Sequence, residues 1–226
     1  MSVFVPSPAE GVFRQGEIVS DVIQVHLRPD TLGPDAGDVE LEEKVHPYAL
    51  LLTQDCDLDW DFKARSAAVG EDEPDTEKRA QEANKRQAKL VPNVLLCELT
   101  TAAILRPFLA GTDILRRIRN NLDERYHCLL AVRPEDDRAG EGLPELVADF
   151  KRVFSIPTDE LYLRITLGMR RRARLQSPYL QHLSTRFGYY CLRVALPNDP
   201  SLELPPPQAA VPVALPLPPE DGGPAA

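Results

Sequence analysis

Short runs of apolar and β-branched residues alternate with polar stretches along most of this chain. Residues 17–25 (EIVSDVIQV) are rich in β-branched side chains, whereas residues 28–43 contain two prolines and two glycines among acidic residues and predict a long loop. Short apolar runs that end in turn or polar residues are typical of strands in a buried sheet. The pattern predicts seven strands: 17–25, 47–54, 91–101, 126–132, 143–156, 161–167 and 169–175. Gly168 predicts a turn that makes the last two a hairpin.

Three segments have the composition or periodicity of helices. Residues 62–89 are rich in Ala, Glu, Lys, Arg and Gln but carry no apolar stripe, which is typical of a helix that projects into solvent, bridges to a partner or forms only in part. We interpret this segment as an insertion between two strands. Residues 102–122 predict a helix in two pieces, split by Pro107 and Gly111, and residues 179–194 carry a sound apolar stripe.

These elements predict one α+β domain with appendages. We interpret residues 1–15 as an N-terminal arm and residues 16–196 as the domain. Residues 197–226 form a tail in which ten of 30 residues are proline, which favours an extended or disordered chain. A hydrophobic content of 43% in 226 residues is enough for a core.

Aspartate occupies every second position directly after the apolar run at 47–54, from Asp55 to Asp61. In an extended segment these carboxylates lie on one face, about 7 Å apart, close enough to share a divalent cation. One interpretation makes Asp55, Asp57 and Asp59 the ligands of a metal-dependent hydrolase. The other makes the cluster a solvated strand end anchored by Trp60. No sequence motif indicates any cofactor beyond a possible divalent cation.

The net charge of −9 is unevenly distributed. Residues 151–193 contain nine Arg and Lys against two acidic residues, whereas residues 1–150 contain 17 basic and 29 acidic residues. A basic face on an acidic protein suits phosphates or an acidic partner, but it equally suits ion pairs with the chain's own acidic half. As a strand, residues 169–175 place Arg170, Arg172 and Arg174 on one face. The candidate contacts to RNA, DNA or a protein partner are Arg170, Arg171, Arg172, Arg174, Arg116 and Arg117.

The cysteine pattern predicts a cytoplasmic protein. The four cysteines are far apart and form no CxxC pair, as is usual where thiols stay reduced. The N-terminus has no signal-peptide pattern, and no apolar run approaches the roughly 20 residues of a membrane helix. We therefore expect no membrane contact.

Three motifs in the first half of the chain resemble the MazF/PemK family of toxin ribonucleases. Residues 15–19 (QGEIV) are similar to the family's first strand, which follows an Arg-Gly-Asp-Ile-Val pattern. Residues 46–53 (HPYALLLT) stand where the family carries Arg-Pro, an aliphatic run and Ser or Thr, and residues 94–100 (VLLCELT) are similar to an aliphatic run that closes on Pro-Ile-Thr. The resemblance implies an SH3-like β-barrel, here elaborated by the insertion at 62–89 and a C-terminal helix.

The same resemblance implies catalytic roles for His46 and Thr53. Thr53 matches the family's hydroxyl position, whereas His46 replaces its catalytic arginine. Such a site needs a base to activate the 2′-hydroxyl and a cation to stabilise the phosphorane, and His46 is a candidate for the base. The neighbouring aspartates depart from this picture, because they repel RNA.

Together these patterns lead us to expect a cytoplasmic accessory or regulatory protein that binds a protein partner or nucleic acid through an arginine-rich face. The resemblance adds a possible setting in a toxin–antitoxin or phage-defence system. The alternatives are a MazF/PemK-like endoribonuclease and a metal-dependent hydrolase that uses the aspartate cluster.

Overall fold

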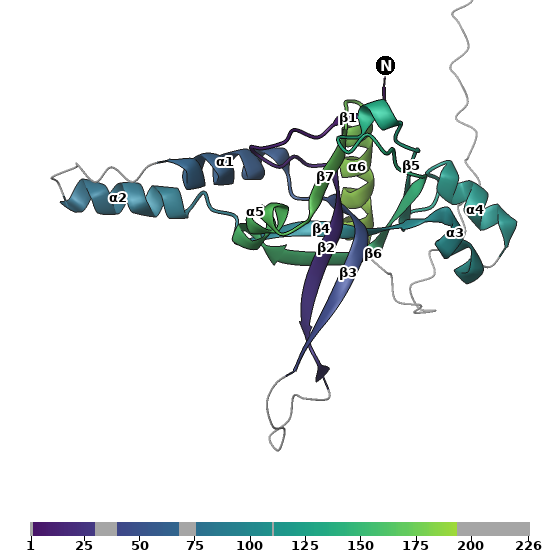
Figure 1. Cartoon of the computed structure of the whole chain (residues 1–226), viewed down its shortest axis with the longest axis horizontal. Helices are drawn as coiled ribbons and strands as arrows, with labels where there is room; N and C mark the ends of the chain where they lie inside the picture. The colour runs from purple at the N-terminus through teal and green to yellow at the C-terminus, as the bar shows by residue number, and fades with distance from the viewer. Residues whose placement is uncertain (1, 30–39, 68–75, 110, 194–226) are drawn as a thin grey trace, which may run out of the picture. The chain divides into compact units, whose positions relative to one another are not determined.

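A computed structural model describes residues 2–29, 40–67, 76–109 and 111–193 (Figure 1). The predicted tail at 197–226 lies outside them. The predicted α+β class is confirmed. The strands are β1 (Phe4–Pro6), β2 (Glu17–Leu27), β3 (Leu41–Leu51), β4 (Asn93–Thr101), β5 (Tyr126–Leu129), β6 (Leu146–Pro157) and β7 (Arg170–Leu175). The helices are α1 (Asp55–Ser66), α2 (Thr76–Gln87), α3 (Ala102–Leu105), α4 (Thr112–Arg119), α5 (Thr158–Thr166) and α6 (Tyr179–Leu192).

The strands form one sheet in the order β1-β7-β2-β3-β4-β6-β5, and every neighbouring pair is antiparallel. The outer strands, β1 and β5, do not pair with each other, so the sheet is open. The predicted SH3-like barrel is therefore not closed. Both outer strands are short, with three and four residues. Helices pack on the two faces of the open sheet, whereas in a barrel the strands would continue around a closed ring.

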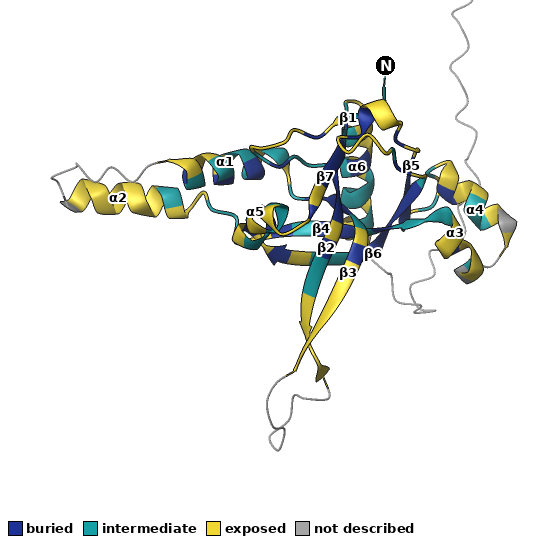
Figure 2. Cartoon of the chain, viewed as in Figure 1, coloured by how far each residue is buried: buried dark blue, intermediate teal, exposed yellow. Residues whose placement is uncertain are grey.

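Two apolar clusters attach the helices to opposite faces of the sheet. Consecutive residues of β3 alternate between the clusters: Leu50 belongs to the first and Leu51 to the second. Leu183 of α6 packs in the first cluster, and Leu58 of α1 and Leu161 of α5 pack in the second. A smaller third cluster joins α4 to β5 and β6. The buried residues accordingly concentrate along the strands (Figure 2).

Residues 161–167, predicted as a strand, belong to helix α5 for all but the last residue. Leu161, Tyr162 and Ile165 pack against the second cluster, and positions i, i+1 and i+4 form one face of a helix. Two acidic residues in the first turn also favour the helix, because they interact with the positive end of its dipole. The predicted hairpin of 161–167 with 169–175 is therefore wrong, and β7 pairs with β1 and β2 instead.

The aspartate-rich segment is also helical, contrary to the extended conformation on which its predicted acidic face depended. Helix α1 begins at Asp55, and its buried residues Leu58, Asp61 and Ala64 recur every three positions. A short alternation of polar and apolar residues is compatible with a strand or a helix, and the packing of Leu58 in the core decides between them. The predicted insertion at 62–89 is helical in much of its described part, but its first helix begins earlier.

Strands β2 and β3 extend beyond their other neighbours as a two-stranded ribbon. β2 pairs with β7 only through residues 17–20, and β3 pairs with β4 only through residues 48–51, whereas β2 and β3 remain paired to their far ends. Residues 21–27 and 41–47 therefore form what we call the β2–β3 ribbon, which is mostly exposed in Figure 2.

Candidate functional site

His46, the predicted catalytic base, lies within β3 with its side chain 1% exposed. Its ring stacks on Phe154 with ring centroids 4.1 Å apart, and Nε2 lies 3.0 Å from Oε1 of Gln24. Nδ1 lies 3.3 Å from a carboxylate oxygen of Glu98. Burial, assisted by the Lys44 ammonium, lowers the pKa of His46, although Glu98 opposes that shift. A ring enclosed in this way does not face a substrate, so its position does not favour a catalytic role.

Thr53, the other predicted catalytic residue, follows β3 and connects it to β4. Its hydroxyl accepts a hydrogen bond of 2.7 Å from the Leu95 backbone N–H. The strand from His46 to Leu51 alone spans about 17 Å, whereas acid–base partners must lie within hydrogen-bond reach of a common substrate. The structure therefore does not bring the predicted catalytic pair together.

The three predicted metal ligands do not share a face, because their segment is a helix. Asp55 Oδ1 accepts a hydrogen bond of 2.8 Å from the Gln15 backbone N–H, and Asp59 forms an ion pair with Lys63. Asp57 lies about 200° around the helix from its odd-numbered neighbours. In the described ranges, no group of three or more His, Cys, Asp or Glu side chains is arranged to hold a metal ion. The prediction that these carboxylates form an aligned row on one face is therefore wrong.

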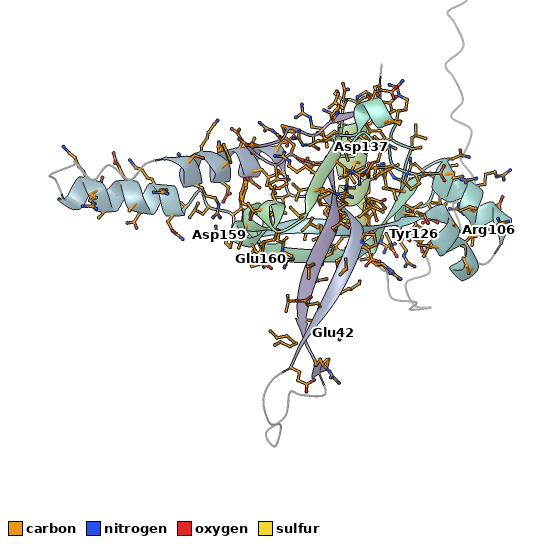
Figure 3. All side chains as sticks on the ribbon, in the orientation of Figure 1. Glu42, Arg106, Tyr126, Asp137, Asp159 and Glu160 are labelled. Atoms are coloured by element: carbon orange, nitrogen blue, oxygen red, sulfur yellow. The ribbon has the colours of Figure 1, made fainter. Side chains whose placement is uncertain are left out.

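Two of the four arginines of β7 are buried, which corrects the expectation of an exposed arginine face. Arg171 pairs with Glu17 and Arg172 pairs with Asp137, and each of these side chains is at most 2% exposed. β7 lies inside the sheet, between β1 and β2, and apolar clusters cover both faces of the sheet. Side chains of β7 can therefore be buried on either face, and the register of β7 on β2 also shifts between Ile18 and Val19. Asp137, labelled in Figure 3, accepts a hydrogen bond of 2.9 Å from Arg172 of β7.

The other predicted basic contacts are scattered. Arg170 pairs at the surface with Glu141, and Arg174 is half-buried. Arg116 and Arg117 are exposed on α4, where Arg116 pairs with an aspartate three residues earlier. The chain's own carboxylates thus neutralise most of the basic run. This is the second of the two alternatives from the sequence, ion pairs with the acidic half of the chain.

One face of the β2–β3 ribbon is apolar and exposed, a feature that the sequence analysis missed. Residues directly opposite each other in two strands point to the same face. The pairs on this face are Ile23 with Val45, Val25 with Glu43, and Leu27 with Leu41. Four of these apolar side chains are 47–65% exposed. The opposite face is polar and includes Glu42, which Figure 3 shows towards the end of the ribbon.

Helix α5 enlarges this apolar area. Leu163 and Leu167, which are 57% and 72% exposed, line a groove of about 200 Å³ together with Ile23, Val25 and Met169. Six of the thirteen large apolar side chains exposed in the described ranges gather here, and such clustering marks interaction sites. We call this the ribbon–α5 surface, formed by Ile23, Val25, Leu27, Leu41, Val45, Leu163 and Leu167.

Glu43 lies within the ribbon–α5 surface, opposite Val25, and forms no ion pair with any residue that the structure describes. Glu160, which also lines the groove, lies in the first turn of α5 and is labelled in Figure 3, and Arg164 neutralises it. An entirely apolar partner would remove water from the Glu43 carboxylate without replacing its interactions, which is unfavourable. The surface therefore fits an apolar partner that also brings a cationic group.

The sequence contains a signal for this surface in the apolar alternation on both sides of the predicted loop. Ile23, Val25 and Leu27 precede the loop, and Leu41 and Val45 occupy every fourth position at its end. As the two arms of a hairpin these residues share a face. The prolines and glycines between them instead predicted a loop as far as residue 43, which concealed the second arm.

Comparison with known proteins adds no family to this picture. The chain matches no protein-family model, no curated protein and no solved structure. Among the described helices, none is both long and apolar enough to cross a membrane. Function must therefore be argued from the surfaces of this chain.

Proposed function

We propose that this chain is a binding protein with an accessory or regulatory role, and that it recognises a protein partner through the ribbon–α5 surface. The observation that carries the proposal is the gathering of six exposed apolar side chains on the ribbon–α5 surface. Three of them line a groove together with Glu43, which has no ion-pair partner among the described residues. Water contact with so much apolar area is unfavourable, and a partner that covers it gains free energy in proportion to the area buried.

An extended segment of the partner suits the ribbon best. Residues 21–27 and 41–47 each pair with only one neighbouring strand, so both edges of the ribbon have free backbone groups. A segment that adds to such an edge presents every second side chain to the same face. Apolar residues at alternate positions would meet the apolar face, and a Lys or Arg would meet Glu43.

A second copy of this chain suits the surface less well. A two-fold symmetric pairing brings the same patch of both copies together, so two Glu43 carboxylates would enter one apolar interface. Like charges in such an interface destabilise it. The proposed partner is therefore a different protein that places a cationic side chain against Glu43.

The finer expectations from the sequence remain predictions. The MazF/PemK resemblance, its SH3-like fold and a toxin–antitoxin or phage-defence setting gain no support from the open sheet. Ribonuclease activity at His46 and Thr53 and a cation at the aspartates gain none from the positions of those residues. Cytoplasmic localisation rests on the cysteine pattern.

A pair of synthetic peptides tests the proposal. We expect a labelled peptide with Thr at every second position and Val at the others, one of which is replaced by Lys to meet Glu43, to bind the full chain at least tenfold more tightly than a counterpart with Glu in place of that Lys, as measured by fluorescence anisotropy. The double change Val45→Asn and Leu163→Asn should weaken this binding about tenfold, or about 1.4 kcal/mol, because it makes both elements of the surface polar. Glu43→Gln should reduce the preference for lysine.

The matched control is Ile104→Asn with Leu122→Asn, which changes two equally exposed apolar residues elsewhere. Equal binding of the peptide by the two double variants would rule out the ribbon–α5 surface as the binding site. Sedimentation velocity provides a second check: we expect a monomer, and a dimer that dissociates with Val45→Asn and Leu163→Asn would instead make the partner a second copy.

A further inference from the structure

The only tryptophan of the chain lies in a groove between α1 and α2, away from the ribbon–α5 surface. Trp60 is 56% exposed, although a large aromatic side chain of this kind is usually mostly buried. The groove has a volume of about 620 Å³, and its apolar lining includes Ala64, Ala83 and Leu90 beside the indole. An exposed indole beside small apolar residues is a platform on which a flat ring can stack.

The rest of the lining is basic, although the protein as a whole is acidic. Among the described residues that line the groove, Glu82 is the single acidic one, against five basic ones: Lys63, Arg79, Lys85, Arg86 and Lys89. Lys63 is paired with Asp59 on α1. No residue in the described ranges forms an ion pair with Arg79, Lys85 or Lys89. Within the described part of the chain, no carboxylate competes with an anionic ligand for these three cations.

The groove continues on the other side of Arg86 and Leu90 into a second hollow of about 520 Å³. Two further aromatic residues, Phe62 and Tyr162, line the second hollow, whose Arg65 is already paired with Asp61 and Asp159. Burial raises the pKa of Tyr162 to about 12, so its ring is neutral and suited to aromatic contact. The two hollows together thus carry aromatic and basic side chains over a distance longer than a single stacked ring.

We infer that the α1–α2 groove binds a single-stranded nucleic acid, with a base stacked on Trp60 and phosphates held by Arg79, Lys85 and Lys89. Basic residues alone would attract any polyanion, and an aromatic residue alone would attract any flat ring. Their combination along one groove is the arrangement that single-strand-binding proteins use. Double-stranded nucleic acid fits poorly, because its bases are stacked inside the duplex and cannot reach the indole.

The experiment uses the full chain and a fluorescein-labelled oligothymidylate of about ten nucleotides, within the site sizes usual for such grooves. We expect anisotropy to report binding at low salt and unlabelled oligothymidylate to quench the intrinsic fluorescence of Trp60. Trp60→Ala should weaken binding five- to tenfold without changing the salt dependence. Contacts to three phosphates predict a slope of about −2 for log K against log salt, and Lys85→Ala with Lys89→Ala should bring it close to −1.

The matched control is Arg116→Ala with Arg117→Ala, which removes the same charge from α4 and should leave the affinity and the slope unchanged. The ribbon variant Val45→Asn with Leu163→Asn should also bind normally, so the inference and the proposed function can fail separately. Three results would each overturn the inference: Trp60→Ala binding as tightly as the parent, equal weakening by the α4 and groove variants, or a duplex or inorganic polyphosphate competing as well as the single strand.

Discussion

Changing Glu17 to Gln is expected to lower the free energy of unfolding by about 3–5 kcal/mol, which is the loss usual when one partner of a buried ion pair is removed. Arg171 donates to both carboxylate oxygens of Glu17 and to the backbone carbonyls of Gly11 and Val12, at 3.0 and 3.1 Å. Its guanidinium also lies 4.4 Å from the centre of the Phe13 ring. The amide of Gln cannot compensate the buried charge. Urea denaturation followed by circular dichroism measures the loss.

The neighbouring Arg170 provides a matched control, because its ion pair with Glu141 is about half exposed. Arg170→Ala should change stability by no more than about 1 kcal/mol. The double change Glu17→Met with Arg171→Met should destabilise less than Glu17→Gln, since it leaves no isolated charge, although two carbonyls lose their donor. A loss below about 1 kcal/mol for Glu17→Gln would show that water reaches Arg171.

Stability should also fall by about 2 kcal/mol between pH 6.5 and pH 5, and His127 should account for most of this change. Burial, with the cations of Arg186 and His182 nearby, lowers the pKa of His127 from 6.5 to about 3. Below pH 6.5 the unfolded chain therefore takes up a proton that the native protein does not bind until pH 3. The free energy of unfolding decreases by about 1.4 kcal/mol for each pH unit in that interval.

His127→Phe should remove most of this pH dependence while keeping an aromatic ring beside Phe150, which His127 contacts. A smaller slope should remain, because burial also lowers the pKa of His46. His26→Phe is the control, because His26 is exposed and is only the smallest of the influences on the pKa of His46, so the slope should change little. Urea denaturation at pH 6.5, 5.75 and 5 provides the comparison. If the parent protein is equally stable at pH 6.5 and pH 5, His127 is accessible to protons in the native state.

The strands with long apolar runs were predictable from sequence, because a long run of apolar and β-branched residues fits a strand that is buried on both faces. The predicted ranges 17–25, 91–101 and 143–156 correspond to β2, β4 and β6, with ends shifted by at most three residues. The segments at 54–62 and 161–167 failed for one physical reason. Both alternate polar and apolar residues over a short length, so the choice between strand and helix depended on contacts with distant parts of the chain.

The candidate surfaces were harder to predict, because exposure depends on where neighbouring strands end. Val25 and Val45 have the composition of core residues, and they are exposed only because β7 and β4 do not accompany the ribbon that far. Arg171 and Arg172 show the opposite case. Their sequence predicts a solvent-exposed row, but β7 lies inside a sheet covered on both faces, and two carboxylates distant in sequence pair with these arginines in the interior. The sequence indicates Trp60 as an anchor of an extended segment, whereas the residue lies on helix α1.

The order of strands has a consequence for how the chain folds during synthesis. β7 lies between β1 and β2, so Phe4 is opposite Leu175 and Ile18 is opposite Ala173. At usual translation rates of about 5–20 residues per second, β1 waits roughly 10–30 s for the strand that it pairs with. One edge of β2 is unprotected during that time. Nascent chains that stop before residue 170 should therefore bind chaperones that recognise open strand edges, and release should follow the emergence of β7 from the ribosome.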